Sequence, residues 1–506
     1  MDMSHPLTGI EPVEVWDHFY KLTQIPHPSG GERAICLYIY DVAKRYELEV
    51  FMDNAGGDDF GNIIVKCPAA AGYEKSPIVV FQSHLDMVSL PVERKGLPLD
   101  LILDNAVLRA RGSTLGADNG IAVAMALSLI TEPDITHGPL ELLFTINEEA
   151  GMTGALMLSD KALQGRILIN IDSMQEGTLT VSSAGANISI LHMPLTMEPV
   201  KNGFMSVLIK ITGCKGGHSG LDINSGRANA GLLLARILFE ESKKGYLLLN
   251  DISWGNVDNA IPQEAGAAVL IRRNDFRNFK NASQRWEKIF LKEHGKDEGQ
   301  LRVSIDENLP VPDFAMNAVT TKRVFSLLLA LPQGVHKMSS DMEGLVETSS
   351  NVSKVRTSQT GLTVNVSQRS SVDSSLDAII SRCEAAAYLS GAELSNIGTN
   401  YGWKPDMESQ LLAVCKDSYR QIYGEEPKVT GIHGMLECGL IKAKYPDMDV
   451  ISIGPTILDA HAPTKADFSP EADSGTTGER IDTAHMPGFW EFVKVILKNI
   501  ALLKSS

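Results

Sequence analysis

The stretch LELLFTINEEAGMTGA, residues 140–155, begins as an apolar strand and continues into two adjacent carboxylates, Glu148 and Glu149. Neighbouring carboxylates repel each other, and burying them costs free energy unless a cation or hydrogen bonds compensate for their charge. One interpretation is a solvated turn that opens a helix, because Glu in a first turn suits the helix dipole. The other is a pair of functional carboxylates at the end of a buried strand. The stretch alone leaves both interpretations open.

The composition is that of a large globular protein, and it argues against nucleic acid or a membrane as partner. The chain has 506 residues, a formal net charge of −16 and no basic stripe of the kind that a phosphate backbone requires. It shows neither a signal-peptide pattern nor a run of 18 apolar residues, so we expect a cytoplasmic protein. The six cysteines include no CxxC pair and are expected to be reduced thiols.

Residues 1–182 alternate apolar strands with helical stretches, which is typical of an α/β layer. The stretch NGIAVAMALSLI, residues 119–130, is apolar on nearly every face and predicts a buried helix. Strands are expected at 62–66, 77–83, 140–146 and 166–171.

The character of the sequence changes twice along the chain. Residues 183–399 contain longer alternating strands, such as 205–213 and 361–370, and predict a separate α+β domain. The α/β pattern returns in residues 400–506. The predicted fold is therefore α/β, with a mixed sheet flanked by helices in a discontinuous domain formed by 1–182 and 400–506, and with an α+β domain inserted into it.

Titratable residues follow the ends of several expected strands. Ligands of open α/β sheets gather at the carboxyl ends of strands, so we expect these side chains at one edge of the sheet. Each residue alone has an ordinary explanation, such as a surface turn, or an N-cap for a lone Asp. Together they form the mixture of nitrogen and oxygen ligands that suits zinc, manganese or cobalt. The set comprises His84, Asp86, Asp118, Glu148, Glu149, Asp172 and His461.

Six segments occur in an order that resembles a known enzyme family: SHLDMV, GADNG, NEEAGMTGA, NIDS, GGHSG and HAP. The family is that of the aminoacyl-histidine dipeptidases, cytosolic non-specific dipeptidases that hydrolyse Xaa-His and other unblocked dipeptides. It belongs to the co-catalytic zinc exopeptidases and aminoacylases. The resemblance covers nearly the whole chain and implies a zinc-exopeptidase catalytic domain with an inserted lid. It also implies a homodimer formed through the lid, for which strand 205–213 offers material at an edge.

The resemblance further implies two zinc ions per chain, with manganese or cobalt as substitutes. By position, His84 and Asp172 look like ligands of one ion, and Glu149 and His461 look like ligands of the other. Asp118 looks like the carboxylate that bridges both ions, and the family has a cis peptide bond directly after it.

The two adjacent glutamates would then have different roles. Glu149 looks like a metal ligand, whereas Glu148 matches the general base of the family. A water bridging the two ions would lose a proton to Glu148 and attack the peptide carbonyl, and Glu148 would then protonate the leaving amine. Asp86 resembles the carboxylate that orients the ligand His84.

Three residues of the inserted domain match substrate-contacting positions of the family. His218, in GCKGGHSG, would stabilise the oxyanion, and we expect it to act on the neighbouring chain of the dimer. Asn259 and Arg369 lie where related enzymes bind the substrate's carbonyl and carboxylate. Without the resemblance, all three would pass as ordinary polar residues of loops and surfaces.

His433 matches a histidine that lines the substrate pocket of the family. Its spacing to Glu437 is i, i+4, which on a helix would also allow the pair to bind a metal. Gly431 and Gly434 disfavour a helix there.

One segment departs from the family, and two other functions stay open. The polar stretch 465–478 looks like an insertion close to His461, so it puts the rim of the site and the substrate preference in doubt. An N-acyl amino acid amidohydrolase could use the same two metals on acylated substrates. A non-catalytic relative could keep the fold as a binding or dimerisation module, although none of the expected ligands is missing.

Overall fold

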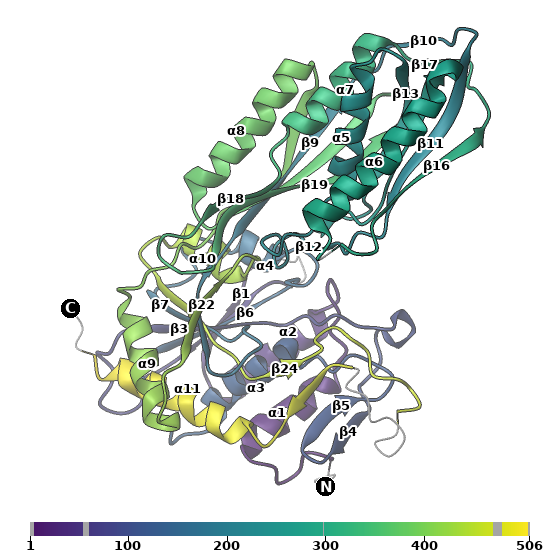
Figure 1. Ribbon diagram of the computed structural model, residues 1–506. Helices are drawn as coiled ribbons and strands as arrows, with labels where there is room; N and C mark the ends of the chain where they lie inside the picture. The colour runs from purple at the N-terminus through teal and green to yellow at the C-terminus, as the bar shows by residue number, and fades with distance from the viewer. Residues whose placement is uncertain (1–4, 54–59, 297, 469–477, 504–506) are drawn as a thin grey trace. The chain divides into compact units, whose positions relative to one another are not determined.

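The computed structural model describes residues 5–53, 60–296, 298–468 and 478–503. The chain divides into two compact units, coloured along the sequence in Figure 1. Unit 1 comprises residues 1–182, 405–431 and 436–506, and unit 2 comprises residues 183–404 and 432–435. Residues 400–404 and 432–435, which the sequence analysis assigned to the first domain, therefore group with unit 2.

Unit 1 is built on an eight-stranded mixed sheet whose central strands are parallel. β3 pairs in parallel with β6 on one side and with β7 on the other, and β7 pairs in parallel with β23. The outer strands β1 and β2 run antiparallel. In sheet order the strands are β1 (Glu49–Met52), β2 (Ile63–Cys67), β6 (Leu140–Thr145), β3 (Val79–His84), β7 (Ile167–Asn170), β23 (Asp449–Ser452), β8 (Thr178–Ser183) and β22 (Lys428–Ile432).

Helices flank this sheet, as the α/β pattern predicts. Every residue of β3 and β6 is buried, which is typical of parallel strands covered on both faces. The expected apolar helix is α3, which packs against β3 and α1 and is buried along nearly its whole length. The helices are α1 (Val13–Thr23), α2 (Arg33–Arg45), α3 (Ala117–Thr131), α4 (Thr153–Met157), α9 (Gln410–Tyr423), α10 (Glu437–Lys444) and α11 (Met486–Ala501).

A small four-stranded sheet in unit 1 joins segments that are far apart in the sequence. β25 pairs with β24 on one side and with β5 on the other, so the end of the chain is held against residues near 107. Its order is β24 (Ile457–Leu458), β25 (Arg480–Asp482), β5 (Val107–Ala110) and β4 (Leu101–Asp104).

Unit 2 is an α+β unit with one large, mostly antiparallel sheet. The main path of the sheet is β16 (Arg302–Leu309), β11 (Phe204–Thr212), β15 (Ala265–Arg272), β13 (Leu247–Trp254), β19 (Val346–Thr357), β20 (Leu362–Ser370), β9 (Gly185–Met193) and β21 (Glu393–Asn400), with β18 (Gly334–Met338) pairing β19. Two short pairs complete the unit: β12 (Gly217–His218) with β14 (Ala260–Ile261), and β10 (Met197–Pro199) with β17 (Phe314–Met316).

Four helices pack on this sheet and close its core. Burial along β9 alternates residue by residue, as expected for a strand with one face covered. The core combines apolar side chains of the strands with those of the helices. The helices are α5 (Ala230–Ser242), α6 (Phe276–His294), α7 (Ala318–Ala330) and α8 (Asp373–Ser390).

The position of β11 corrects one expectation. This strand, predicted over 205–213, is not at an edge of the sheet, because β16 pairs with it on the side away from β15. The edges of the main path are β16 and β21. A local apolar alternation identifies a strand but not its neighbours, and here β16, which comes much later in the sequence, pairs with β11.

Two further features concern the apolar character of the helices and the state of the cysteines. In the described parts of the chain, no helix combines the length and the apolar character that a membrane crossing demands. All six cysteines are buried free thiols, as expected.

Candidate metal centre

The ends of three parallel strands bring most of the expected ligands together in unit 1. His84 is the last residue of β3, and Asp172 follows the end of β7 by two residues. Glu148 and Glu149 come shortly after the end of β6. Because parallel strands end at the same edge of the sheet, these side chains meet there.

Asp118 reaches the same place from the first turn of α3. Gly116, which precedes the helix, has a left-handed φ of 66°, and the peptide bond between Asp118 and Asn119 is cis. The Asn119 amide donates hydrogen bonds to the Ile171 carbonyl at 2.6 Å and to Asp172 Oδ1 at 3.3 Å. The Asn119 side chain thereby fixes the Asp118 turn to the segment that follows β7.

The two carboxylate oxygens of Asp118 face two different histidines. Asp118 Oδ1 lies 3.2 Å from His84 Nε2, and Asp118 Oδ2 lies 3.0 Å from His461 Nε2. Each histidine has a second carboxylate beside it. His84 Nε2 is 3.5 Å from Asp172 Oδ1, and His461 Nε2 is 2.6 Å from Glu149 Oε1.

This donor set fits two divalent cations that share Asp118. Ligand bonds of about 2.0–2.1 Å in a tetrahedral arrangement place neighbouring ligand atoms about 3.3 Å apart, close to most of the distances above. Ligand atoms of His84, Asp118 and Asp172 lie within 4.8 Å of one another, and so do those of Asp118, Glu149 and His461. Imidazole nitrogens and carboxylate oxygens are ligands that zinc, manganese and cobalt accept.

The protonation equilibria show how much negative charge is concentrated here. Burial and the charges of Asp118 and Glu149 together raise the pKa of Asp172 to about 6, against the opposing effect of His84. Hydrogen bonds to Asp118 and Glu149 raise the pKa of His461 to about 10. Burial alone would lower the pKa of His84, but its carboxylate neighbours outweigh burial and raise it well above the usual value. Bound cations would offset the same charge.

The ring of His84 is oriented for metal binding through Nε2. Its Nδ1 lies 3.0 Å from the Asp86 carbonyl oxygen and 3.4 Å from Asp86 Oδ1. A carbonyl oxygen only accepts hydrogen bonds, so Nδ1 carries the ring proton and Nε2 presents its lone pair to the cluster. The backbone of Asp86 therefore contributes to the orientation that the sequence analysis ascribed to its carboxylate.

The Asp86 carboxylate also fixes the turn that carries the glutamate pair. Asp86 Oδ1 accepts the N–H of Glu148 at 2.8 Å, and Oδ2 accepts the N–H of Glu149 at 3.1 Å. The Ser29 hydroxyl also donates to Oδ2 at 2.8 Å. One carboxylate thus connects the end of β3 to the turn after β6.

Glu148 lies beside the ligands but is not among those paired with Asp118. Burial, together with the charges of nearby Asp172, Glu437 and Glu149, raises its pKa to about 9, although His84 opposes this shift. Ligand atoms of Glu148, Glu149 and His84 lie within 4.8 Å of one another. The geometry therefore allows Glu148 to exchange protons in the site, and it also leaves open that Glu148 is a ligand.

The alternative pairing of His433 with Glu437 does not occur on a helix. α10 begins at Glu437, so His433 lies outside it. Glu437 is fully buried in unit 1, where its Oε2 accepts hydrogen bonds from Gln82 Nε2 at 2.7 Å and from Thr145 Oγ1 at 2.6 Å. Burial and the charges of neighbouring carboxylates raise the pKa of Glu437 to about 7.

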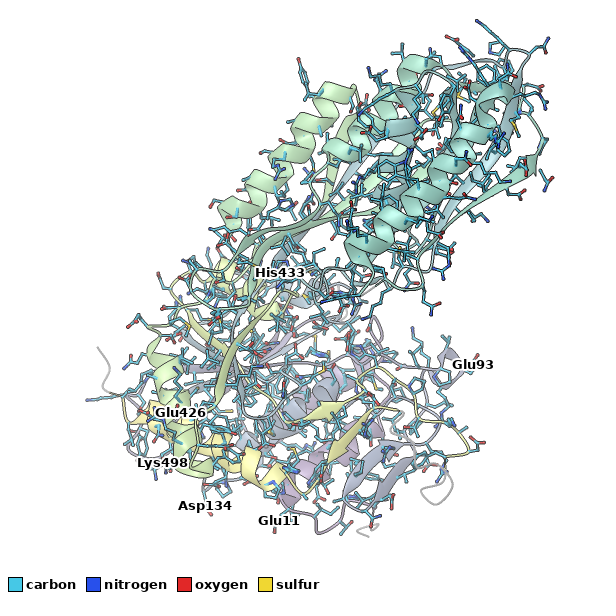
Figure 2. The ribbon with its side chains drawn as sticks, viewed as in Figure 1. Glu11, Glu93, Asp134, Glu426, His433 and Lys498 are labelled. Carbon is cyan, nitrogen blue, oxygen red and sulfur yellow. The ribbon has the colours of Figure 1, made fainter. Side chains whose placement is uncertain are left out.

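Four other residues from the sequence analysis belong to unit 2. Among them, Arg369 affects the pKa of two histidines, His218 and His433. Burial and the charge of Arg369 lower the pKa of His218, and the same two causes lower that of His433 to about 3. His433, labelled in Figure 2, lies with Nε2 2.7 Å from Ser349 Oγ. Asn259 is exposed, and its backbone carbonyl accepts the N–H of Ser219.

His218 and Arg369 each have a hydrogen-bond donor that no group of the described residues uses. His218 Nδ1 accepts the N–H groups of Gly220 and Leu221, both at 3.2 Å, so the neutral ring carries its proton on Nε2. Arg369 is 7% exposed, and no carboxylate of the described residues lies within ion-pair distance of it. Its buried Nε has no hydrogen-bond partner there. A buried guanidinium in this condition is suited to an anionic ligand.

Sequence reasoning missed two buried acids that support the centre. Glu437 was considered only as a helical partner of His433. Glu479 was not considered, yet it is 2% exposed and accepts hydrogen bonds from three backbone N–H groups around Asp118. Burial and the charge of Asp118 raise the pKa of Glu479 to about 7. No periodic signal marks either residue as buried. Of the proposed insertion 465–478, residues 469–477 lie outside the described residues.

Two known proteins are similar to this chain over nearly its full length. The chain is 35% identical over 501 residues to the cytosol non-specific dipeptidase of Escherichia coli strain K12, which covers 98% of this chain and 99% of that protein. The crystal structure of aminoacylhistidine dipeptidase from Vibrio alginolyticus matches with a TM-score of 0.89 and 34% identity, over 99% of both chains.

A more distant structure shares the fold alone. The aminopeptidase PepT from Bacillus cereus matches with a TM-score of 0.56 and 16% identity, over 97% of this chain and 99% of that one. The family description that matches residues 80–476 is that of peptidase family M20/M25/M40. The segment 80–476 contains every ligand position described above, and the chain belongs to this peptidase family.

Proposed function

We propose that this protein is a dipeptidase that uses two divalent cations to hydrolyse unblocked dipeptides, including Xaa-His dipeptides. The observation that carries the proposal is the shared position of Asp118, whose two oxygens face His84 and His461. The names of the two full-length relatives, one a non-specific dipeptidase and the other an aminoacylhistidine dipeptidase, support the substrate class.

In this proposal the ligands divide into two sets around one bridge. His84 and Asp172 would hold one cation, Glu149 and His461 would hold the other, and Asp118 would be shared between them. Zinc is the expected metal, and manganese or cobalt could replace it because the ligands are nitrogen and oxygen atoms without thiolates.

Glu148 is the proposed general base. Bound cations would supply Lewis-acid activation of a water molecule and of the peptide carbonyl. Glu148 takes a proton from the attacking water and later delivers it to the leaving amine. Asp86 keeps Glu148 in place for this task, because it accepts the backbone N–H of that residue.

Residues of unit 2 are proposed to bind the substrate. His218 can donate from Nε2 to the oxyanion that forms at the attacked carbonyl, since its Nδ1 is occupied by backbone N–H groups. Arg369 would pair with the substrate carboxylate, for which it has a buried and unpaired guanidinium nitrogen. Asn259 and His433 would complete the pocket with polar contacts.

The cellular location is proposed from the relatives. The E. coli relative is named a cytosol dipeptidase, and we propose the cytoplasm for this protein as well. Buried free thiols are compatible with a reducing compartment.

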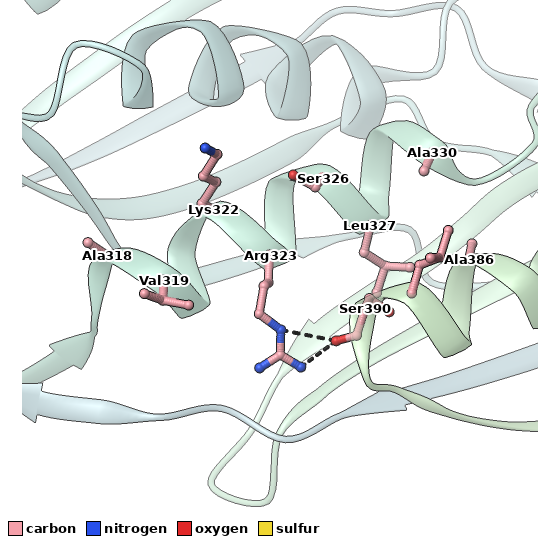
Figure 3. A pocket seen from close by; sticks show the side chains of 10 residues that line it. Ala318, Val319, Lys322, Arg323, Ser326, Leu327, Ala330, Ala386 and Ser390 are labelled. Carbon is pink, nitrogen blue, oxygen red and sulfur yellow. Dashed lines mark hydrogen bonds between the residues drawn. The ribbon is translucent and has the colours of Figure 1, made fainter.

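We further propose a homodimer that forms through unit 2. The edge strand β21 is mostly exposed and packs against α8, whose C-terminal residues Tyr388 and Leu389 are 86% and 84% exposed. A groove of about 640 Å³ between α7 and α8 continues this surface. Figure 3 shows its lining, in which apolar side chains such as Val319 and Leu327 lie beside Lys322 and Arg323, with Arg323 Nε donating to the Ser390 carbonyl. An open edge strand beside exposed apolar side chains is suited to pairing with a second copy.

Metal analysis tests the two-cation proposal. Elemental analysis of the purified protein after gentle dialysis should give about two divalent ions per chain, as two-metal hydrolysis requires. Activity should disappear with a chelator and return with zinc, manganese or cobalt. A metal content near zero together with chelator-insensitive activity would contradict the metalloenzyme proposal.

Substitution of each glutamate of the pair separates base from ligand. Glu148→Gln should keep both metals and lose turnover on the order of a hundredfold or more, because proton transfer is lost while ligation remains. Glu149→Gln should weaken the binding of one metal. Metal content and kcat are to be measured on both variants. If Glu148→Gln loses metal to the same extent as Glu149→Gln, Glu148 is a ligand and the assignment of the base fails.

A substrate panel separates the proposed dipeptidase from the two other functions. Free dipeptides, including Xaa-His, should be hydrolysed on the order of a hundredfold or more faster than their N-acetylated forms, because the acetyl group removes the free amine. Preference for acylated amino acids would instead identify an amidohydrolase. Absence of hydrolysis in both series, with two metals bound, would identify a binding module.

Complementation tests both the dimer and the role of His218 in it. His218→Ala and Glu148→Gln chains, each inactive alone, are mixed and allowed to exchange subunits. If His218 acts on the neighbouring chain, one site in each mixed dimer is complete, and activity should return to about a quarter of the wild-type value.

A control variant and the oligomeric state make this result decisive. His192→Ala changes a histidine elsewhere in unit 2, and it should retain activity without mixing. Light scattering should show a dimer, and labelled chains should verify the exchange. Verified exchange without recovery would mean that His218 does not act in trans.

A further inference from the structure

Glu479 is a buried acid whose place in the fold is set by the small sheet of unit 1. It directly precedes β25, and the pairing of Arg480 with Leu458 brings it next to the segment that leads from β24 to His461. The residue is 2% exposed. No lysine or arginine of the described residues lies within ion-pair distance of its carboxylate.

Backbone N–H groups take the place of a counter-ion. Glu479 Oε2 accepts hydrogen bonds from the N–H groups of Leu115 at 2.8 Å and Gly116 at 3.1 Å. Its Oε1 accepts the N–H of Asp118 at 3.2 Å. Converging backbone N–H groups form a concavity that stabilises the ionised form of a carboxyl group, and here that group is a side chain of the same protein.

The backbone of Glu479 holds the segment of the second ligand. Its N–H donates to the Ala462 carbonyl at 2.7 Å, and Ala462 follows His461 directly. His461 itself has a φ of 65°, a left-handed conformation that residues other than glycine seldom adopt. Such a conformation persists when its surroundings fix it, and the hydrogen bond from Glu479 is part of those surroundings.

One residue therefore joins the two segments that carry Asp118 and His461. The two side chains they present lie 3.0 Å apart, between Asp118 Oδ2 and His461 Nε2. The segments are 343 residues apart in the sequence, so only tertiary contacts can set this distance.

We infer that Glu479 is a positioning residue of the metal centre, which fixes Asp118 and His461 relative to each other so that both meet the same cation. The inference rests on the two-cation function proposed above. Both carboxylate oxygens of Glu479 accept backbone N–H groups, so we assign it a positioning role through the two ligand segments. Partners of this kind, which orient metal ligands, typically contribute 10–100-fold to metal affinity.

The test is the metal affinity of Glu479→Gln. The amide keeps the size of the side chain but turns one acceptor oxygen into an NH2 group, which then faces a backbone N–H. We expect the cation held by Asp118 and His461 to bind about 10–100-fold more weakly, with a smaller effect on the cation held by His84 and Asp172. Competition with a chromogenic chelator measures zinc affinity, and the absorption spectrum of the cobalt-loaded protein reports the ligand geometry.

Glu141→Gln is the matched control for lost stability. Glu141 is also 2% exposed in unit 1, and its carboxylate also accepts backbone N–H groups, those of Gln164 and Gly165. It lies near the start of β6, at the opposite end of the strand from the glutamate pair. Glu141→Gln should lower the Tm but leave zinc affinity and the cobalt spectrum unchanged.

Zinc affinity of Glu479→Gln equal to that of the wild type would overturn the inference, and so would an equal loss of affinity in Glu141→Gln. Glu479→Asp, which keeps the charge but shortens the side chain, is the second variant and should also weaken the same cation. A wild-type protein that binds no metal would contradict the proposed function and this inference with it. Bound metal in the wild type, with unchanged affinity in a folded variant, would contradict the inference alone.

Hydrogen exchange of the wild type decides the question if neither variant folds. The N–H groups of Leu115, Gly116 and Asp118 should already be protected in the metal-free protein, because Glu479 and not the metal holds them. Rapid exchange that slows only when zinc is added would overturn the inference.

Discussion

A single carboxylate, that of Asp118, is the constraint on which the rest of the centre depends. Its oxygens lie 3.2 Å from His84 and 3.0 Å from His461, so a small rotation of this side chain would separate the two halves of the site. The surrounding structure opposes such a rotation from several sides. Asn119 fixes the turn to the end of β7, and Glu479 accepts the N–H of Asp118 itself. Much of the local structure, including the left-handed Gly116, serves to present these two oxygens.

The electrostatics of the site follow from crowding carboxylates at one sheet edge. Burial and mutual repulsion raise the pKa of Asp172 and of Glu148. The charged forms of these carboxylates therefore cost free energy at neutral pH unless cations or protons balance the charge. The carboxylates are crowded because the parallel strands that carry them all end at the same edge of the sheet. Asp86 fixes the turn that carries the glutamate pair, since its carboxylate accepts the backbone N–H groups of both Glu148 and Glu149. Two like charges side by side are thereby kept in distinct positions, which is what two distinct roles need.

The candidate substrate-binding residues of unit 2 are neutral or positive. Burial lowers the pKa of His218 and His433, so both rings are uncharged donors or acceptors near neutral pH. Arg369 supplies a positive charge without a counter-ion among the described residues. A dipeptide offers a carbonyl and a carboxylate, and these groups match such donors.

The sequence by itself determined many of the helices and strands and placed most of the candidate ligands at one edge of the sheet. Apolar strands at 77–83, 140–146 and 166–171 appear as β3, β6 and β7, and the helix after Asp118 is buried as its composition predicts. These features are local, because periodicity and strand ends depend on neighbouring residues. His84, the glutamate pair and Asp172 could be placed at one edge because the ends of parallel strands coincide.

Tertiary structure alone decided the features that depend on distant partners. The apolar alternation of β11 says nothing of β16, which pairs with it and is itself the edge strand on that side of the sheet. The two glycines already disfavoured a helix with His433, but only the structure shows that Glu437 is buried against Gln82 of β3 and Thr145 of β6. Glu479 has no local mark of burial, and its role rests on three N–H groups more than 360 residues earlier in the chain. Which residue meets which across such separations is fixed by strand register and packing, and a local sequence pattern does not contain this information.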